Sequence, residues 1–185
     1  MRNPKEKKRG AQLYGALVAL IVLASAAISP GLSAQSETSE AAALEVAQAF
    51  MGALGGGDIE TLERLMADDM VWHNEGDAEI PWIGPWDGKR AILDTFLPAY
   101  GAGAQTLMWE VDHASGDDHV ATLTGRMSLL LKASGVETGP TSWAVKVAVR
   151  DGQVVHWHWY EDSLLISRAF HGSAPPPPRT RQGGP

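Results

Sequence analysis

The sequence predicts an α+β domain in which N-terminal helices pack on a curved, mostly antiparallel sheet. Apolar residues recur at helical spacing in the first half of the 185-residue chain, whereas long alternating runs dominate the second half. Gly and Asp residues separate those runs in the way that hairpin turns separate strands. Helices that come first, followed by antiparallel strands, are typical of a sheet that helices cover on one face.

The helices of the first half follow from spacing and from their end signals. A helix is expected over about residues 40–54, because Gly55-Gly56-Gly57 would stop it there. A second helix should begin after Asp58, a favoured N-cap residue, since three apolar residues follow at helical spacing: Leu62, Leu65 and Met66.

A short strand is predicted next, over residues 70–74 (MVWHN). Alternation places Trp72 and Asn74 on one face of this strand and His73 on the other. We expect a turn over residues 84–88 and a third helix that starts near Lys89 and that Pro98 soon ends.

The second half consists of strand-like runs. They cover residues 106–114, 119–133, 141–150 and 153–161, and a short helix over residues 163–170 should close the domain.

The two ends of the chain differ in amino-acid composition from the domain between them. Residues 1–34 have the basic start, the apolar run and the small residues of an export signal, with cleavage expected after Ala34. The alternative is an uncleaved membrane anchor over residues 13–29. Residues 35–39 are predicted to be a linker, residues 40–172 the domain, and residues 173–185 a disordered Pro-rich tail.

Composition excludes several classes of function. Removal of residues 1–34 takes away five basic residues and one Glu, so the formal net charge moves from −7 to −11. We therefore expect no nucleic-acid partner and, after cleavage, no membrane partner. The absence of Cys excludes disulfides and thiolate chemistry. A periplasmic or extracellular location is expected.

Three segments carry a family resemblance. They are the stretch Gly57–Phe96 with its GDIE and ADD segments, the turn Arg150–Val154 (RDGQV) and the closing Tyr160-Glu161-Asp162. Together and in this order they resemble the SnoaL-like branch of the NTF2-like (nuclear-transport-factor-2-like) superfamily, which includes ketosteroid isomerase and polyketide cyclases. The resemblance implies a cone-shaped fold whose open end admits a small ligand.

The resemblance also shows which catalytic groups are missing. The isomerase branch uses a tyrosine, an aspartate base and a protonated aspartic acid. These fall on Phe50, Asn74 and Val145 in this sequence. None of the three can supply the required base or strong donor, so the steroid-isomerase mechanism is not expected here.

Other residues of the implied cone predict a pocket walled by indoles. Glu161 is the candidate catalytic residue, because a carboxyl group among tryptophans should have a raised pKa. The alternative is that Glu161 and Asp162 only cap the closing helix. The expected ligand-binding residues are Phe50, Trp72, Asn74, Trp82, Trp86, Trp157, Trp159 and Glu161. Trp82 and Trp86 are placed in a loop at the rim, where they would either stack on a flat ligand or cover the core.

The histidines suggest a second kind of site. His73, Glu75, His156 and His158 have spacings that would suit a metal ion, but alternation puts them on the outer face of the sheet. Because HxH is common on strands without a metal, we predict surface or interface histidines, no metal and no cofactor.

The sequence is compatible with three functions. The first is an exported SnoaL-like protein whose Trp-lined cone pocket binds a small, largely apolar ligand. The second is an enzyme of the isomerase, cyclase or hydratase type that uses Glu161 or a histidine for acid–base chemistry. The third is a non-catalytic module that forms a homodimer through the outer sheet face. Because related folds serve each of these roles, fold alone does not decide among them.

Overall fold

A computed structural model describes residues 42–173 of the chain. The expected export signal or anchor, the linker and residues 174–185 of the expected tail lie outside the described residues. Within the described part, no helix combines the length and the apolar character needed to cross a membrane.

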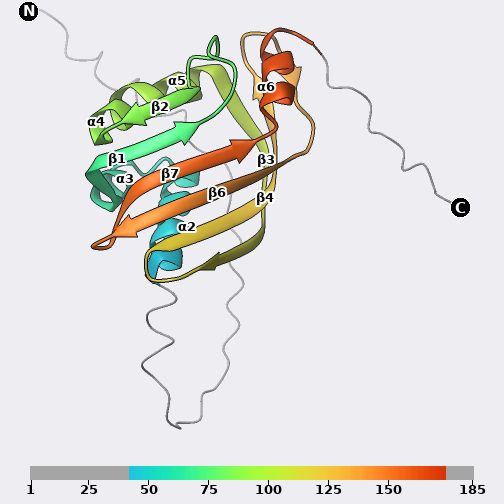
Figure 1. Ribbon diagram of the computed structural model, residues 1–185. Helices are drawn as coiled ribbons and strands as arrows, with labels where there is room; N and C mark the ends of the chain where they lie inside the picture. The colour runs from blue at the N-terminus through green and yellow to red at the C-terminus, as the bar shows by residue number, and fades with distance from the viewer. Residues whose placement is uncertain (1–41, 174–185) are drawn as a thin grey trace, which may run out of the picture.

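Helices α2 (Ala42–Gly56) and α3 (Ile59–Leu65) begin the domain, as expected. Asp58 caps α3, because its carboxylate accepts the backbone N–H of Thr61 at 3.0 Å. One stripe of α2 is buried and consists of Ala43, Ala47, Phe50 and Ala53. This stripe faces the sheet, and α2 lies against its concave side (Figure 1).

The sheet contains seven strands in the order β2-β1-β7-β6-β4-β3, with β5 added beside β4. Their bounds are β1 Met66–Asn74, β2 Gly84–Asp87, β3 Ala104–Gly116, β4 Val120–Leu131, β5 Val136–Glu137, β6 Thr141–Arg150 and β7 Gln153–Glu161. Only the β1–β7 pair is parallel among these strands. The long strands curl around α2 (Figure 1), so the α+β cone that the sequence predicted is confirmed.

Three details of the first half differ from the sequence-based expectation. Strand β1 begins at Met66 and not at Met70, so Met66 belongs to the strand and not to the second helix. Residues 84–87 form β2, which pairs with β1, and not only a turn. Pro98 does not end the third helix, because a π-helical turn, η1 (Ile92–Phe96), separates α4 (Lys89–Ala91) from α5 (Leu97–Gly103). Pro98 therefore falls in the first turn of α5, where a missing N–H costs little.

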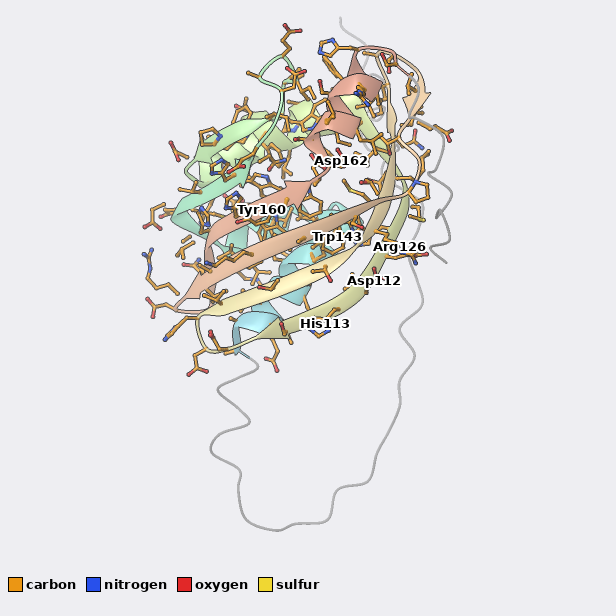
Figure 2. All side chains as sticks on the ribbon, turned by 45° about the vertical axis from the view of Figure 1, so that its right-hand side comes forward. Asp112, His113, Arg126, Trp143, Tyr160 and Asp162 are labelled. Atoms are coloured by element: carbon orange, nitrogen blue, oxygen red, sulfur yellow. The ribbon has the colours of Figure 1, made fainter. Side chains whose placement is uncertain are left out.

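The concave face of the sheet is the core of the domain. On β6, Trp143, Val145, Val147 and Val149 are buried, and their neighbours in the sequence face outward. Helix α6 (Ser163–Phe170) follows β7 and packs beside β5, and Asp162 caps it by accepting the N–H of Leu165 at 3.0 Å. Figure 2 shows Asp162 where β7 passes into α6.

Candidate ligand-binding site

The faces of β1 and β7 lie as alternation predicted. Trp72 and Asn74 are buried on the concave side, and in register they neighbour Trp157 and Trp159 of β7. The parallel pairing of β1 and β7 therefore places the aromatic residues of both strands side by side.

One end of the concave face is a closed aromatic cluster. Trp72 and Trp157 stack with ring centroids 5.3 Å apart, and Phe50 of α2 packs on Trp157 at 4.8 Å. Phe96 covers Trp72 at 4.5 Å. Asn74 serves this cluster, since its side-chain oxygen accepts the indole N–H of Trp72. These side chains fill the part of the cone that they line.

The other end holds a stack of three indoles from three strands: Trp109 of β3, Trp143 of β6 and Trp159 of β7. The centroid distances are 4.4 Å for Trp109–Trp143 and 5.2 Å for Trp143–Trp159. Gly125 of β4 makes the first contact possible, because a Cβ there would lie 2.6 Å from the Trp143 ring. Sequence reasoning identified Trp159 as a ligand-binding candidate but missed Trp109 and Trp143.

Glu161 lies at this second end, opposite Trp143 in the β6–β7 register. Its Oε2 accepts the indole N–H of Trp159 at 3.1 Å. Burial raises the pKa of the Glu161 carboxyl, an effect that the hydrogen bond from Trp159 opposes and that Asp162 reinforces. Asp162 alone caps α6, so the capping alternative for Glu161 is not what the structure shows.

Tyr100 is a further polar group at this end that the sequence analysis missed. Its hydroxyl is 3.5 Å from Oγ1 of Thr106 on β3. Burial raises the pKa of Tyr100 to about 12, and the negative charge of Glu161 adds to this shift. The phenol and the carboxyl group therefore share one electrostatic environment. No motif marks Tyr100, and only the packing of α5 over β3 brings it there.

Two indole N–H groups of the core have no hydrogen-bond partner among the described residues. They belong to Trp143, which is 2% exposed, and to Trp157, which is fully buried. A buried donor that remains unpaired costs about 1–3 kcal/mol, so such groups need an explanation. A water molecule or a ligand that carries an acceptor would satisfy them.

Trp82 and Trp86 lie apart from the indole stack. Trp82 is 1% exposed and packs edge-on against Tyr100 and Phe170, with Gly103 leaving room for its ring. Trp86 is half-buried, contacts Phe96, and donates its N–H to the carbonyl oxygen of Trp82 at 3.3 Å. With these contacts, Trp82 and Trp86 cover the core, which is one of the two roles expected for them; the other was stacking on a flat ligand.

The three positions of the isomerase catalytic groups lie in the core. Phe50 and Val145 are fully buried, and Asn74 is 6% exposed. Asn74 is bonded to Trp72, and Val145 lies beside Trp159 in register. Six of the eight expected ligand-binding residues thus lie on one concave face, divided between the closed cluster and the indole stack, whereas Trp82 and Trp86 lie apart from the stack.

The outer face of the same strands carries the histidines. His73 and His158 stack with centroids 4.6 Å apart, and Glu75 lies beside both rings. His156 contacts His158 edge-on at 5.7 Å. The predicted placement opposite the tryptophans is therefore correct.

A curled α+β sheet with an aromatic concave face is consistent with a ligand-binding or isomerase-type fold. Residues 47–157 match the family model of the SnoaL-like domain. This match covers more than half of the chain, which therefore belongs to the SnoaL-like family within the NTF2-like superfamily. No curated protein matches the sequence.

Solved structures agree with this assignment at the level of the fold. An NTF2-like protein from Burkholderia xenovorans LB400 is 21% identical with a TM-score of 0.65, over 71% of this chain and 98% of that one. An NTF2-like protein from Burkholderia thailandensis E264 is 18% identical with a TM-score of 0.59, over 68% and 94%. An LEH-like epoxide hydrolase from M. tuberculosis is 17% identical with a TM-score of 0.54, over 71% and 91%.

Proposed function

We propose that this protein binds a small, flat, largely apolar molecule that carries a hydrogen-bond acceptor, at the indole stack of Trp109, Trp143 and Trp159. The observation that carries the proposal is the unpaired, buried N–H of Trp143 next to Glu161. A carbonyl, ether or epoxide oxygen of the ligand would accept this hydrogen bond, and the indole faces would hold its apolar body.

We place the ligand at the indole stack because some of the side chains at this end of the cone are exposed to solvent. Trp109, Tyr100 and Glu161 are partly exposed, whereas Trp72 is 5% exposed and Trp157 and Phe50 are fully buried. A ligand can therefore approach the indole stack from the side of Trp109, and the ring of Trp143, which is 2% exposed, must move to admit it. Sites for small apolar ligands bury most of the ligand surface and contain few polar groups. The three indoles and one carboxyl group at this end form a lining of that kind.

The test is tryptophan fluorescence of the full chain, titrated with steroids, terpenoids, aromatic ketones and an aryl epoxide. Saturable quenching is expected for at least one class. Trp143→Phe removes the N–H and keeps an aromatic ring, so it should weaken binding of an oxygen-bearing ligand by about 3- to 10-fold. Binding of the matched hydrocarbon should be nearly unchanged. Trp86→Phe is the control, because Trp86 lies outside the stack.

Absence of saturable quenching across the panel by the folded protein would refute the proposal. So would equal losses for the ketone and its hydrocarbon analogue in Trp143→Phe, because the indole N–H would then have no partner in the ligand. In either case the third function, association through the outer sheet face, becomes the better explanation of the domain.

An enzymatic role is the second candidate, and the raised pKa of Glu161 favours it. Because burial favours the neutral form of Glu161, its carboxyl group can donate a proton to a ligand oxygen and recover it later. Glu161→Gln should then abolish turnover of a bound ligand while its affinity changes little. Equal turnover by the wild type and the variant would leave binding as the only function of the site.

We also propose that residues 1–34 direct export, as their charge and hydrophobic pattern suggest. Intact mass of the protein recovered from the periplasm tests this, with Gln35 expected as the new N-terminus. A mass that retains residues 1–34 in the membrane fraction would favour the anchor over residues 13–29.

A further inference from the structure

The outer face of β1 and β7 brings two histidines and a glutamate together. His73 and His158 are register partners in the parallel pair, so their rings stack with an interplanar angle of 13°. Oε1 of Glu75 lies 4.0 Å from Nε2 of His73 and 3.6 Å from Nε2 of His158. The candidate ligand atoms of the three residues all lie within 4.8 Å of one another.

We propose that His73, His158 and Glu75 form a binding site for a divalent transition-metal ion such as Zn²⁺, on the sheet face opposite the indole stack. Two imidazole nitrogens and one carboxylate oxygen are a ligand set that zinc uses in proteins, with a fourth position left open for water. The sequence alone did not favour this site, because HxH is common on strands without a metal and alternation places these residues on the outer face.

The environment of His158 is the second observation behind this site. Its Nε2 is buried and has no hydrogen-bond partner among the described residues, although it faces Glu75. The other ring nitrogen, Nδ1, lies 2.9 Å from the hydroxyl of Tyr160. When Nδ1–H donates to this hydroxyl, Nε2 keeps its lone pair free for a metal. Histidine ligands commonly have their second nitrogen held in this way.

The geometry requires a small contraction. Zinc bonds of about 2.0–2.1 Å in a tetrahedral site place ligand atoms roughly 3.4 Å apart, so the present separations must shorten by up to about 1.4 Å and the stacked rings must turn. Glu75 can supply part of this movement, because its side chain is 70% exposed. His73 can turn as well, since it is half-buried. His158 is held by Tyr160 and would be the fixed ligand.

Two nearby groups bear on the affinity. His156 contacts the His158 ring edge-on, although it is not among the three residues whose ligand atoms converge. Lys146 lies beside His158 in the β6–β7 register, and its exposed side chain adds a positive charge that opposes a cation. We therefore expect binding through coordination bonds and not through a favourable surface charge.

The experiment uses the full chain without a polyhistidine tag and measures Zn²⁺ binding by equilibrium dialysis, with the visible absorption of Co²⁺ as a second readout. One ion per chain is expected. His158→Gln and Glu75→Gln each remove a ligand of the ion, so each should weaken zinc binding at least about tenfold. Tyr160→Phe removes the hydrogen bond that supports His158, so it should weaken zinc binding by about tenfold. His113→Gln, on exposed β3, is the matched control.

The result that overturns the site is equal zinc affinity of the wild type and Glu75→Gln, or no saturable binding by the wild type. Glu75 is exposed, so its variant tests the site even if His158→Gln disturbs the fold. Loss of binding in His113→Gln would also count against it. Ligand binding at the indole stack is measured separately, since the side chains of Glu75 and Tyr160 lie with the histidines.

Discussion

The indole of Trp159 donates a hydrogen bond to Glu161, two residues further along the same strand, at 3.1 Å. Alternation alone puts both side chains on the concave face of β7, and the bond links the stacking surface to the acidic group. The aromatic wall and the carboxyl group are therefore one unit, in which a change of either residue alters the other.

Trp159→Phe should raise the pKa of Glu161 further. The hydrogen bond from Trp159 favours the charged carboxylate, whereas burial disfavours it, so removal of the donor leaves burial unopposed. Titration of the Glu161 side-chain carboxyl carbon by NMR measures the effect. Trp109→Phe is the control, because Trp109 stacks on Trp159 and makes no hydrogen bond with Glu161. A lower pKa in Trp159→Phe would contradict this account.

Glu161→Gln should stabilise the protein above the ordinary carboxyl pKa. A folded-state pKa raised above 4.5 means that the native state binds more protons than the unfolded state, so stability falls as pH rises from 4.5 through the raised value. Gln keeps an acceptor for Trp159 and carries no charge. The free energy of unfolding of the variant, relative to the wild type, should therefore grow with pH across this window and then level off.

Urea denaturation at several pH values measures this difference. A difference that is constant across the pH series would show that Glu161 has an ordinary pKa in the folded protein. The general-acid role would then lose its support.

The strands of the second half and α6 were predictable because their signals are local. β6, β7 and α6 occur at the predicted residues 141–150, 153–161 and 163–170, where alternating runs end at Gly, Asp or an N-cap residue. β2 was not recognisable, because Gly84–Asp87 contains Gly and Pro and is extended only through its pairing with β1.

The candidate site was predictable only in part, because half of it depends on contacts between distant strands. Trp157, Trp159 and Glu161 share one strand, so alternation found them. Trp109 and Trp143 meet across β4, and a sequence pattern does not show that Gly125 lies between them. Contacts of this kind depend on strand order and register, which a single sequence encodes only weakly.

Gly125→Ala should destabilise the domain and disturb the indole stack. The added Cβ would lie 1.9 Å from the carbonyl oxygen of Glu110 and 2.6 Å from the Trp143 ring, so both β3 and the indole must move. Overpacking of this type costs about 1–3 kcal/mol or more. The free energy of unfolding from urea titration, followed by fluorescence, checks the cost.

Gly52→Ala provides the contrasting substitution. Gly52 lies within α2, and a Cβ there would meet nothing within 4 Å. Alanine should stabilise the helix by about 0.5–1 kcal/mol, because it lowers the backbone entropy of the unfolded chain. Equal effects of the two Gly→Ala changes would show that the contact at Gly125 is not tight.

Asp77→Asn should weaken the attachment of α6 and flatten the acid dependence of stability. Asp77 accepts hydrogen bonds from Ser167 at 2.6 Å and from the N–H of Glu79 at 3.0 Å, and His171 lies 2.9 Å away. These bonds, that of Ser167 first, lower the pKa of Asp77 from 3.8 to about 2.

A lowered folded-state pKa means that the unfolded chain binds the proton first, so the contribution of Asp77 is complete above pH 4 and is lost as pH falls toward 2. The free energy of unfolding of Asp77→Asn should therefore depend less steeply on pH in this window than that of the wild type. Ser167→Ala should have a slope between the two. If Asp77→Asn kept the wild-type slope, the hydrogen bonds between the residue 75–83 loop and α6 would not be formed in solution.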